Sequence, residues 1–207
     1  MRKVKILRSN LNYLITITVV LVVFIGGMSC SGTSQILKLA DTAQAAEEVG
    51  IENPTVQANN QFGLQLFQRL YQTNKNLFIS PLSISIALTM TLNGANGDTQ
   101  QEMKKALALY DLDLETINSD FGSLQKSLQL NSPPVKLQIA NSLWGREDLV
   151  FDSDFLQTNR DYFNATLQSV NFKNQQSITD INQWVKDRTS GKINRVISQV
   201  EPETILF

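Results

Sequence analysis

The sequence contains no histidine and only one cysteine, Cys30, among its 207 residues. Without histidine, neither a Ser-His-Asp triad nor a Cys-His pair can form within the chain. A single cysteine excludes an intrachain disulfide and a cysteine-rich zinc site. Asp111, Asp113 and Glu115 lie close together, but they lack the glycine and the spacing of a calcium-binding loop. We therefore expect a protein that is not an enzyme and that binds no metal or other cofactor.

Acidic residues are absent from the first forty positions, and four basic residues occur in the first eight. The whole chain carries 18 basic and 19 acidic residues, a formal net charge of −1. Without the first 29 residues, fourteen basic residues remain against nineteen acidic ones, a net charge of −5. A mildly acidic body gives no electrostatic attraction for a phosphate backbone. Nucleic acid is therefore not an expected partner.

The N-terminus has the order of a secretory signal peptide. Basic residues come first, an apolar run of twelve follows at 14–25, and the small residues of Gly26-Gly-Met-Ser-Cys30 end it. The run is short for a membrane-spanning helix, which needs roughly 20 residues. Counting from Leu11 to Met28 leaves an uncleaved anchor as an alternative. We predict that residues 1–29 are a signal peptide or a membrane anchor, and that the protein is secreted, extracellular, or held on the outer face of a cell-envelope membrane.

Cys30 adds a further alternative, because a lone cysteine after an apolar run resembles the lipidation site of bacterial lipoproteins. The match is partial, since that motif usually has leucine where this chain has Gly27, and Met28 is also atypical. Cys30 is thus a candidate lipidation site, beside plain cleavage or retention as an anchor. A lipid there would hold the protein on a membrane. Residues 30–58 are rich in Ala, Gln, Thr and Glu, and we expect a flexible tether.

The remainder of the chain predicts an α+β fold, because helical and alternating apolar patterns occur in irregular order without a repeat. The expected helices cover 60–73, 82–92, a segment opened by a Thr99–Glu102 capping box, 114–128, 153–163 and a stretch from 177 to about 190. The expected strands cover 76–79, 135–144 and 166–172. We expect N-terminal helices packed on a mixed or antiparallel sheet.

Five segments of this body, in order and spacing, carry a family resemblance. They are Asn76-Leu-Phe-Ile-Ser-Pro-Leu-Ser-Ile-Ser85 with Leu92-Asn-Gly-Ala-Asn-Gly-Asp-Thr-Gln-Gln-Glu-Met103, Ile139-Ala-Asn-Ser-Leu-Trp144, Tyr162-Phe-Asn-Ala165, Val170-Asn-Phe172, and Ile181-Asn-Gln-Trp-Val-Lys-Asp-Arg-Thr-Ser-Gly-Lys-Ile193. Together they resemble the N-terminal part of a serpin, a family of serine protease inhibitors. The resemblance covers residues 60–207, about the first half of a complete serpin.

The resemblance implies a serpin-like fold, incomplete at the C-terminus, with 59–207 as the N-terminal part of a serpin domain. Serpins trap a protease when an exposed reactive loop near their C-terminus is cleaved and inserts as an extra strand into the main sheet. That loop is expected outside this chain, so no reactive-bond residue can be named. The implied partner of a complete chain is a serine or cysteine protease, and the 207 residues alone are expected to be non-inhibitory. The alternative is a non-inhibitory cell-envelope lipoprotein or binding protein derived from the serpin fold.

Four residues match the serpin motif at which the main sheet opens: Asn76, Ser80, Pro81 and Ser83. Buried hydroxyls at such a place can exchange hydrogen-bond partners without a large change in packing. The simpler interpretation is that Ser80 caps the helix that starts at Pro81, and that Ser83 is a satisfied hydroxyl in the core.

Overall fold

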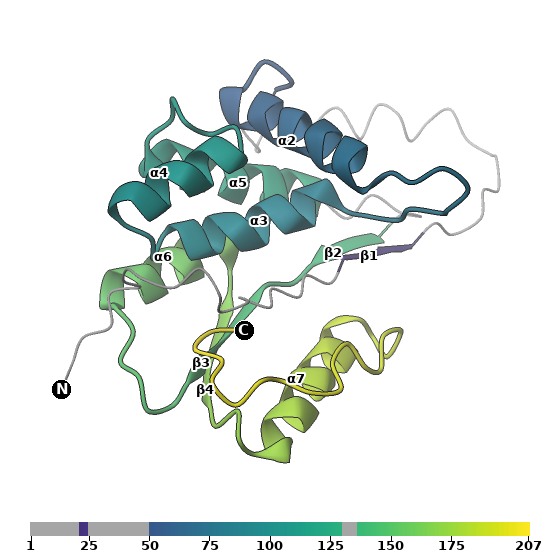
Figure 1. Cartoon of the computed structure of the whole chain (residues 1–207), viewed down its shortest axis with the longest axis vertical. Helices are drawn as coiled ribbons and strands as arrows, with labels where there is room; N and C mark the ends of the chain where they lie inside the picture. The colour runs from purple at the N-terminus through teal and green to yellow at the C-terminus, as the bar shows by residue number, and fades with distance from the viewer. Residues whose placement is uncertain (1–20, 25–49, 130–135) are drawn as a thin grey trace, which may run out of the picture.

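The computed structural model describes residues 21–24, 50–129 and 136–207 (Figure 1). Cys30, residues 30–49 of the predicted tether, and 25 of the 29 residues of the predicted signal peptide or anchor lie outside these residues. The elements in chain order are β1 (Leu21–Phe24), α2 (Pro54–Leu70), α3 (Pro81–Leu92), α4 (Gly97–Ala106), α5 (Leu114–Leu128), β2 (Lys136–Ile139), β3 (Ser142–Arg146), α6 (Ser153–Phe163), β4 (Thr166–Val170) and α7 (Gln175–Arg188). The α+β class is confirmed.

Helix α2 begins earlier than the apolar pattern predicts. Asn53 caps it by accepting hydrogen bonds from the N–H groups of Thr55 (2.8 Å) and Val56 (3.1 Å), and Pro54 occupies the first turn. Residues 54–58, which we assigned to the tether, therefore belong to the fold. Thr55 and Ala58 are buried. The helix ends at Leu70, three residues before the predicted end.

The strands form a mixed arrangement around β3. Strands β3 and β4 pair in parallel from Ser142↔Thr166 to Arg146↔Val170. An antiparallel bridge joins Gly145 of β3 to Leu206 in the C-terminal segment. Strand β2 pairs with β1 in the antiparallel direction, so four residues of the predicted signal peptide or anchor are extended here. The single long strand predicted over 135–144 is instead two strands, interrupted at residues 140 and 141.

Two hydrophobic cores lie on opposite faces of these strands. Because side chains alternate along a strand, Leu143 joins the larger core with α2, α3, α5 and α6, while Trp144 joins the smaller one with α7. Figure 1 shows the same division, with the earlier helices on one side of the strands and α7 on the other. Phe121, Phe163 and Ile86 are at most 1% exposed in the larger core, and Ile181 is 1% exposed in the smaller one.

Two local predictions are wrong. Residues 76–79 form no strand, and Phe78 is 94% exposed, because no described strand lies beside this segment. The Thr99–Glu102 capping box does not open α4. That helix starts at Gly97 after Asn96, so Thr99 is already inside the first turn.

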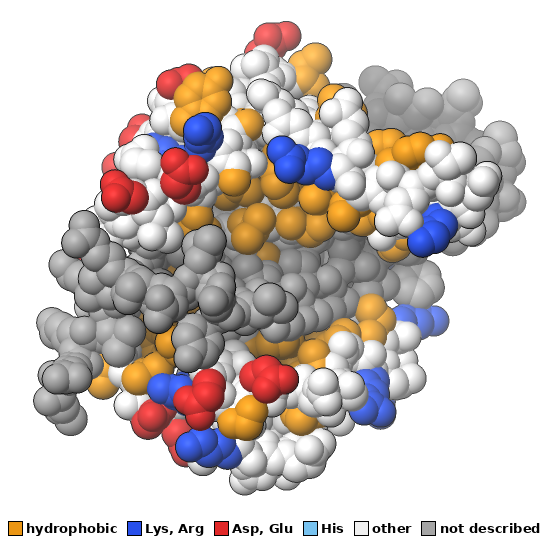
Figure 2. All heavy atoms as spheres, in the orientation of Figure 1, with side chains coloured by type: hydrophobic (Ala, Val, Ile, Leu, Met, Phe, Trp, Pro, Cys, Tyr) orange, Lys and Arg blue, Asp and Glu red, His pale blue; other side chains and the backbone are white. Residues whose placement is uncertain are grey.

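Helix α3 matches the helix predicted over 82–92 and contributes to the larger core. Ile86, Met90 and Leu92 are buried, although Leu82 and Leu88 are only partly covered. Figure 2 shows hydrophobic side chains gathered around α2 and α3, and α2 itself exposes Leu64, Phe67 and Leu70. Among the described residues, no helix is both long and apolar enough to span a membrane.

Candidate functional site

The sheet continues from β3 into the last residues of the chain. The Trp144 N–H donates to the Phe207 carbonyl (2.8 Å), the Phe207 N–H donates back to Trp144 (2.9 Å), and the Arg146 N–H donates to Ile205 (2.9 Å). This ladder is antiparallel, whereas β4 runs parallel on the other edge of β3. Strand β3 is therefore an internal strand with partners on both edges.

Arg146, the last residue of β3, contacts the segment that leads into this ladder. Its Nε donates to Asp148 Oδ1 (2.7 Å), and its Nη1 donates to the Glu203 carbonyl (3.4 Å) and lies 3.6 Å from the Glu203 carboxylate. Both acids are mostly exposed, so each ion pair contributes at most about 1 kcal/mol. The side chain orients residues 203–205 toward β3 rather than strongly stabilising the fold.

Helix α7 covers the face of β3 on which Trp144 lies, through aromatic contacts. The Trp144 and Trp184 rings meet edge to face at 6.5 Å, and the Arg188 guanidinium lies 5.7 Å from the centre of the Trp184 ring. Asn182 ties the following loop to this helix. Its Nδ2 donates to the Ile197 carbonyl (2.9 Å), and its Oδ1 accepts from the Val196 N–H (2.8 Å). This role could not be predicted from the sequence, because a polar residue on a helix does not identify a partner fourteen residues away.

The predicted sheet-opening motif is brought together only in part. Ser80 caps α3, and its Oγ accepts from the Ser83 N–H (3.4 Å) while donating to the Ser83 Oγ (2.9 Å). Ser83 is 4% exposed. Pro81 begins α3 and packs closely against Gly63 of α2. A Cβ added to Gly63 would lie 3.0 Å from the Cβ of Pro81. Asn76 is exposed and lies outside any helix or strand.

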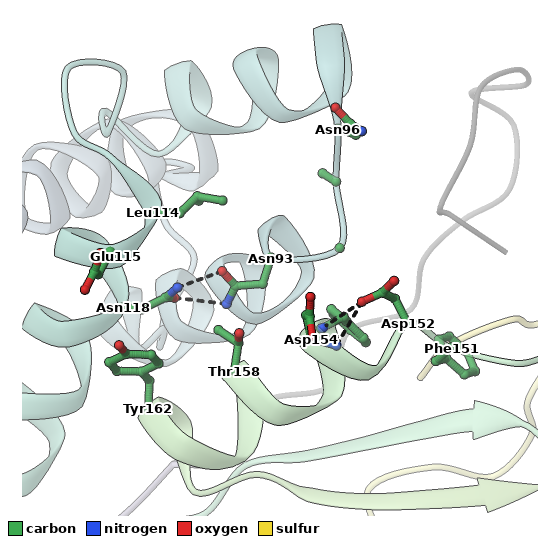
Figure 3. A pocket seen from close by; sticks show the side chains of 13 residues that line it. Asn93, Asn96, Leu114, Glu115, Asn118, Phe151, Asp152, Asp154, Thr158 and Tyr162 are labelled. Carbon is green, nitrogen blue, oxygen red and sulfur yellow. Dashed lines mark hydrogen bonds between the residues drawn. The ribbon is translucent and has the colours of Figure 1, made fainter. Parts of the chain in front are cut away.

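A pocket of 390 Å³ lies between the end of α3 and the starts of α5 and α6 (Figure 3). Asn93 and Asn118 form part of its wall as a reciprocal amide pair, each Nδ2 donating to the other Oδ1 at 2.9 Å. Glu115, Asp152 and Asp154 also line it. Asp152 caps α6 by accepting from the Asp154 N–H (2.9 Å). No group of three or more metal-ligating side chains occurs in the described parts of the chain.

Beside this pocket, Asp113 caps α5. The Thr116 N–H (2.9 Å) and hydroxyl (2.8 Å) both donate to its carboxylate. These hydrogen bonds, that of the backbone first, lower the pKa of Asp113 below its usual value. Asp113 and Asp152 therefore serve as helix caps, and Glu115 and Asp154 lie in the first turns of α5 and α6, where the helix dipole favours a negative charge.

Comparison with known proteins identifies the class. The family model described as "Serpin (serine protease inhibitor)" matches residues 57–207. A leukocyte elastase inhibitor of Equus caballus is 38% identical over 144 residues, and an uncharacterised serpin-like protein of Thermococcus kodakarensis is 33% identical over 162 residues. These alignments cover 68% and 76% of this chain, and 38% and 37% of the two relatives.

Solved structures agree with the sequence comparison. The thermophilic serpin tengpin in its latent state matches with a TM-score of 0.69 and 34% identity, over 76% of this chain and 42% of tengpin. The same protein in its native state matches with a TM-score of 0.66 and 36% identity, over 72% and 38% of the two chains. This chain belongs to the serpin family. It spans less than half the length of the relatives it matches.

Proposed function

We propose that this chain forms the N-terminal part of a serpin-type inhibitor of serine endopeptidases. The observation that carries the proposal is the family match over residues 57–207, together with a fold that aligns with complete serpins. Several relatives are named leukocyte elastase inhibitors, which supports a serine protease as the target class.

In this proposal the chain supplies part of the sheet and its supporting helices, and not the reactive loop that the protease cleaves. Strand β3 pairs in parallel with β4 on one edge and antiparallel with the segment 205–207 on the other, so the described sheet is mixed and continues into the C-terminal residues. Helix α3 packs on one face and α7 on the other. The reactive loop belongs, by family resemblance, to a part of the serpin fold that these 207 residues do not match. Inhibition therefore requires that further part.

A chimera tests the proposal. Residues 1–207 would be joined to the C-terminal portion of tengpin that follows the matched segment, and incubated with elastase-like and trypsin-like serine proteases. We expect a covalent complex that survives SDS, together with loss of protease activity. The 207-residue chain alone should form no such complex. A chimera that unfolds cooperatively yet forms no complex with any protease tested would refute the proposal, because the fold would then be present without the activity.

We further propose that the protein is exported, with lipidation of Cys30 as one route to membrane attachment. The support is the order of basic, apolar and small residues over positions 1–30. Expression in a bacterial host followed by N-terminal sequencing and labelling with a radioactive fatty acid separates the alternatives. Label that enters the wild type but not Cys30→Ala indicates a lipoprotein. An unlabelled protein starting near residue 30 indicates plain cleavage. Cytosolic, full-length protein would contradict export.

A further inference from the structure

Two Asn-Gly pairs lie three residues apart between α3 and α4, at Asn93-Gly94 and Asn96-Gly97. An asparagine followed by glycine is chemically labile because glycine has no side chain to obstruct its backbone nitrogen. That nitrogen can attack the side-chain amide carbon of the asparagine. Both asparagines line the pocket of Figure 3, so their surroundings can be compared directly.

The first pair is held in place by hydrogen bonds. The Asn93 side chain is joined to the nearly buried Asn118 by two hydrogen bonds of 2.9 Å, drawn as dashed lines in Figure 3. The nitrogen that would attack it, that of Gly94, donates to the Thr91 carbonyl at 3.0 Å. Asn93 also has helical backbone angles, φ −62° and ψ −20°. Both reacting groups would have to lose their partners before they could meet.

The second pair has none of these constraints. Asn96 is exposed and makes no side-chain hydrogen bond to the α4 N-terminus that it precedes. Gly97 is the first residue of α4, so its N–H is among the first four, which have no acceptor within a helix. A Cβ placed on Gly97 would meet nothing within 4 Å. The backbone around the reacting atoms is therefore open.

We propose that Asn96 is a site of spontaneous deamidation and that Asn93, with the same following residue, is protected by the fold. The Gly97 nitrogen forms a bond to the Asn96 side-chain carbon as the amide nitrogen leaves as ammonia, which gives a succinimide. Water then opens the ring at either carbonyl and yields aspartate or isoaspartate. No oxidant, metal or enzyme is needed. Each event adds one negative charge beside the pocket and at the N-terminus of α4.

The two products have opposite effects on α4. Aspartate is a favoured helix cap and its charge suits the positive end of the helix. Isoaspartate carries the backbone through the side-chain carbon and so lengthens the chain at the helix start. The site therefore produces two charge variants of equal mass, one compatible with α4 and one that disturbs its first turn.

The experiment follows deamidation by peptide mapping with mass spectrometry in the full 207-residue chain, in neutral buffer and in concentrated urea. In buffer, Asn96 should lose ammonia at least about tenfold faster than Asn93, because hydrogen bonds at Asn93 and Gly94 must break first. In urea the two rates should converge. Equal rates in buffer, or faster loss at Asn93, would overturn the proposal.

A variant tests the cause of the protection. Asn118→Ala removes the amide partner of Asn93 and should raise the Asn93 rate severalfold while leaving the Asn96 rate unchanged. Asn96→Gln, at the other pair, should abolish the fast product. An Asn93 rate that is unaffected by Asn118→Ala would overturn the account of the protection. The comparison between buffer and urea needs no variant, so it decides the proposal even where Asn118→Ala does not fold.

Discussion

Asn159 on α6 supports the end of α3, and replacing it with aspartate should destabilise the protein strongly at neutral pH. Asn159 is 0% exposed, and its Nδ2 donates to the Met90 carbonyl (3.3 Å) and to the Phe155 carbonyl (2.9 Å). Met90 is among the last four residues of α3, whose carbonyls receive no hydrogen bond from an N–H group within the helix. The carbonyls of its neighbours Thr89, Thr91 and Leu92 are satisfied by the N–H groups that follow the helix. Asn159 thus supplies the one donor that comes from another element.

The substitution Asn159→Asp keeps the shape and replaces a donor by a negative charge that faces two carbonyl oxygens. The Asn159 Oδ1 already has no hydrogen-bond partner, so the carboxylate would be buried with nothing to neutralise it. Leaving a buried charge without a partner costs about 3–5 kcal/mol. Since a domain is stable by about 5–15 kcal/mol, this change removes a large part of the stability. Asn159→Leu, which adds no charge, should cost about 1–3 kcal/mol.

The pH dependence separates charge from shape. Burial raises the folded-state pKa of an aspartate at position 159 above the unfolded value of about 3.9. Its protonated form can donate to the Met90 carbonyl, so stability is retained below the unfolded pKa. Stability is then lost as pH rises through the interval up to the raised folded pKa, by about 1.4 kcal/mol for each pH unit. Asn159→Leu should show no such additional slope.

The assay is urea unfolding followed by circular dichroism and by the fluorescence of the two tryptophans. At pH 7 we expect the Asn159→Asp midpoint to fall by roughly 2 M urea. Asn174→Asp is the matched control, because Asn174 caps α7 at the surface by accepting from the Gln176 N–H (2.9 Å) and aspartate caps equally well. Its stability should change by less than about 0.5 kcal/mol. If Asn159→Asp proved no less stable than Asn159→Leu from acid to neutral pH, the assignment of Asn159 as a buried donor would be wrong.

Three further predictions use the same assays. Phe121→Ala, at a side chain 1% exposed, should cost about 3–5 kcal/mol, whereas Leu128→Ala on the same helix at 37% exposure should cost less than about 1 kcal/mol; equal losses would contradict the assigned core. The Asp113 carboxylate stabilises α5 at pH values above its unfolded pKa, and this contribution should disappear as pH falls through its lowered folded pKa. In an acid titration followed by circular dichroism, Asp113→Ala should lack the part of the pH-dependent loss of stability that Asp113 causes. Because exposed apolar patches favour association, we expect the exposed apolar side chains of α2 to make the chain self-associate at high concentration. Leu64→Lys, at a side chain 66% exposed, should reduce this self-association in sedimentation more than Gln65→Lys next to it, and an equal effect would show that charge alone matters.

The sequence predicts those helices best whose caps and apolar periodicity agree. The predicted bounds 114–128 and 153–163 match α5 and α6, where Asp113 and Asp152 occupy the cap positions. The start of α2 was missed although Asn53-Pro54 is a strong start signal, because the polar composition around it indicated a tether. The segment 76–79 was assigned as a buried strand on composition alone. Burial of a short apolar run depends on what lies beside it, which the local sequence does not contain.

The polar contacts of the interior were beyond sequence reasoning for a related reason. Asn159 contacts Met90 across 69 residues, and Asn93 contacts Asn118 across 25. Nothing in a single sequence distinguishes these asparagines from exposed ones, since the partner is set by the packing of α3 against α5 and α6. The contact between Ser80 and Ser83 could be predicted because Ser80 is the cap of α3 and Ser83 follows three residues later, in the first turn. Local polar contacts follow from spacing, and distant ones require the fold.

The alternation of side chains along β3 is repeated in the C-terminal segment that pairs with it. The paired segment places Leu206 against the larger core and Phe207 in the smaller one, just as Leu143 and Trp144 divide between them on β3. Burying one such apolar side chain contributes roughly 1.5–3 kcal/mol. The segment 205–207 therefore buries apolar side chains on both faces of the sheet at once, on the α3 side and on the α7 side.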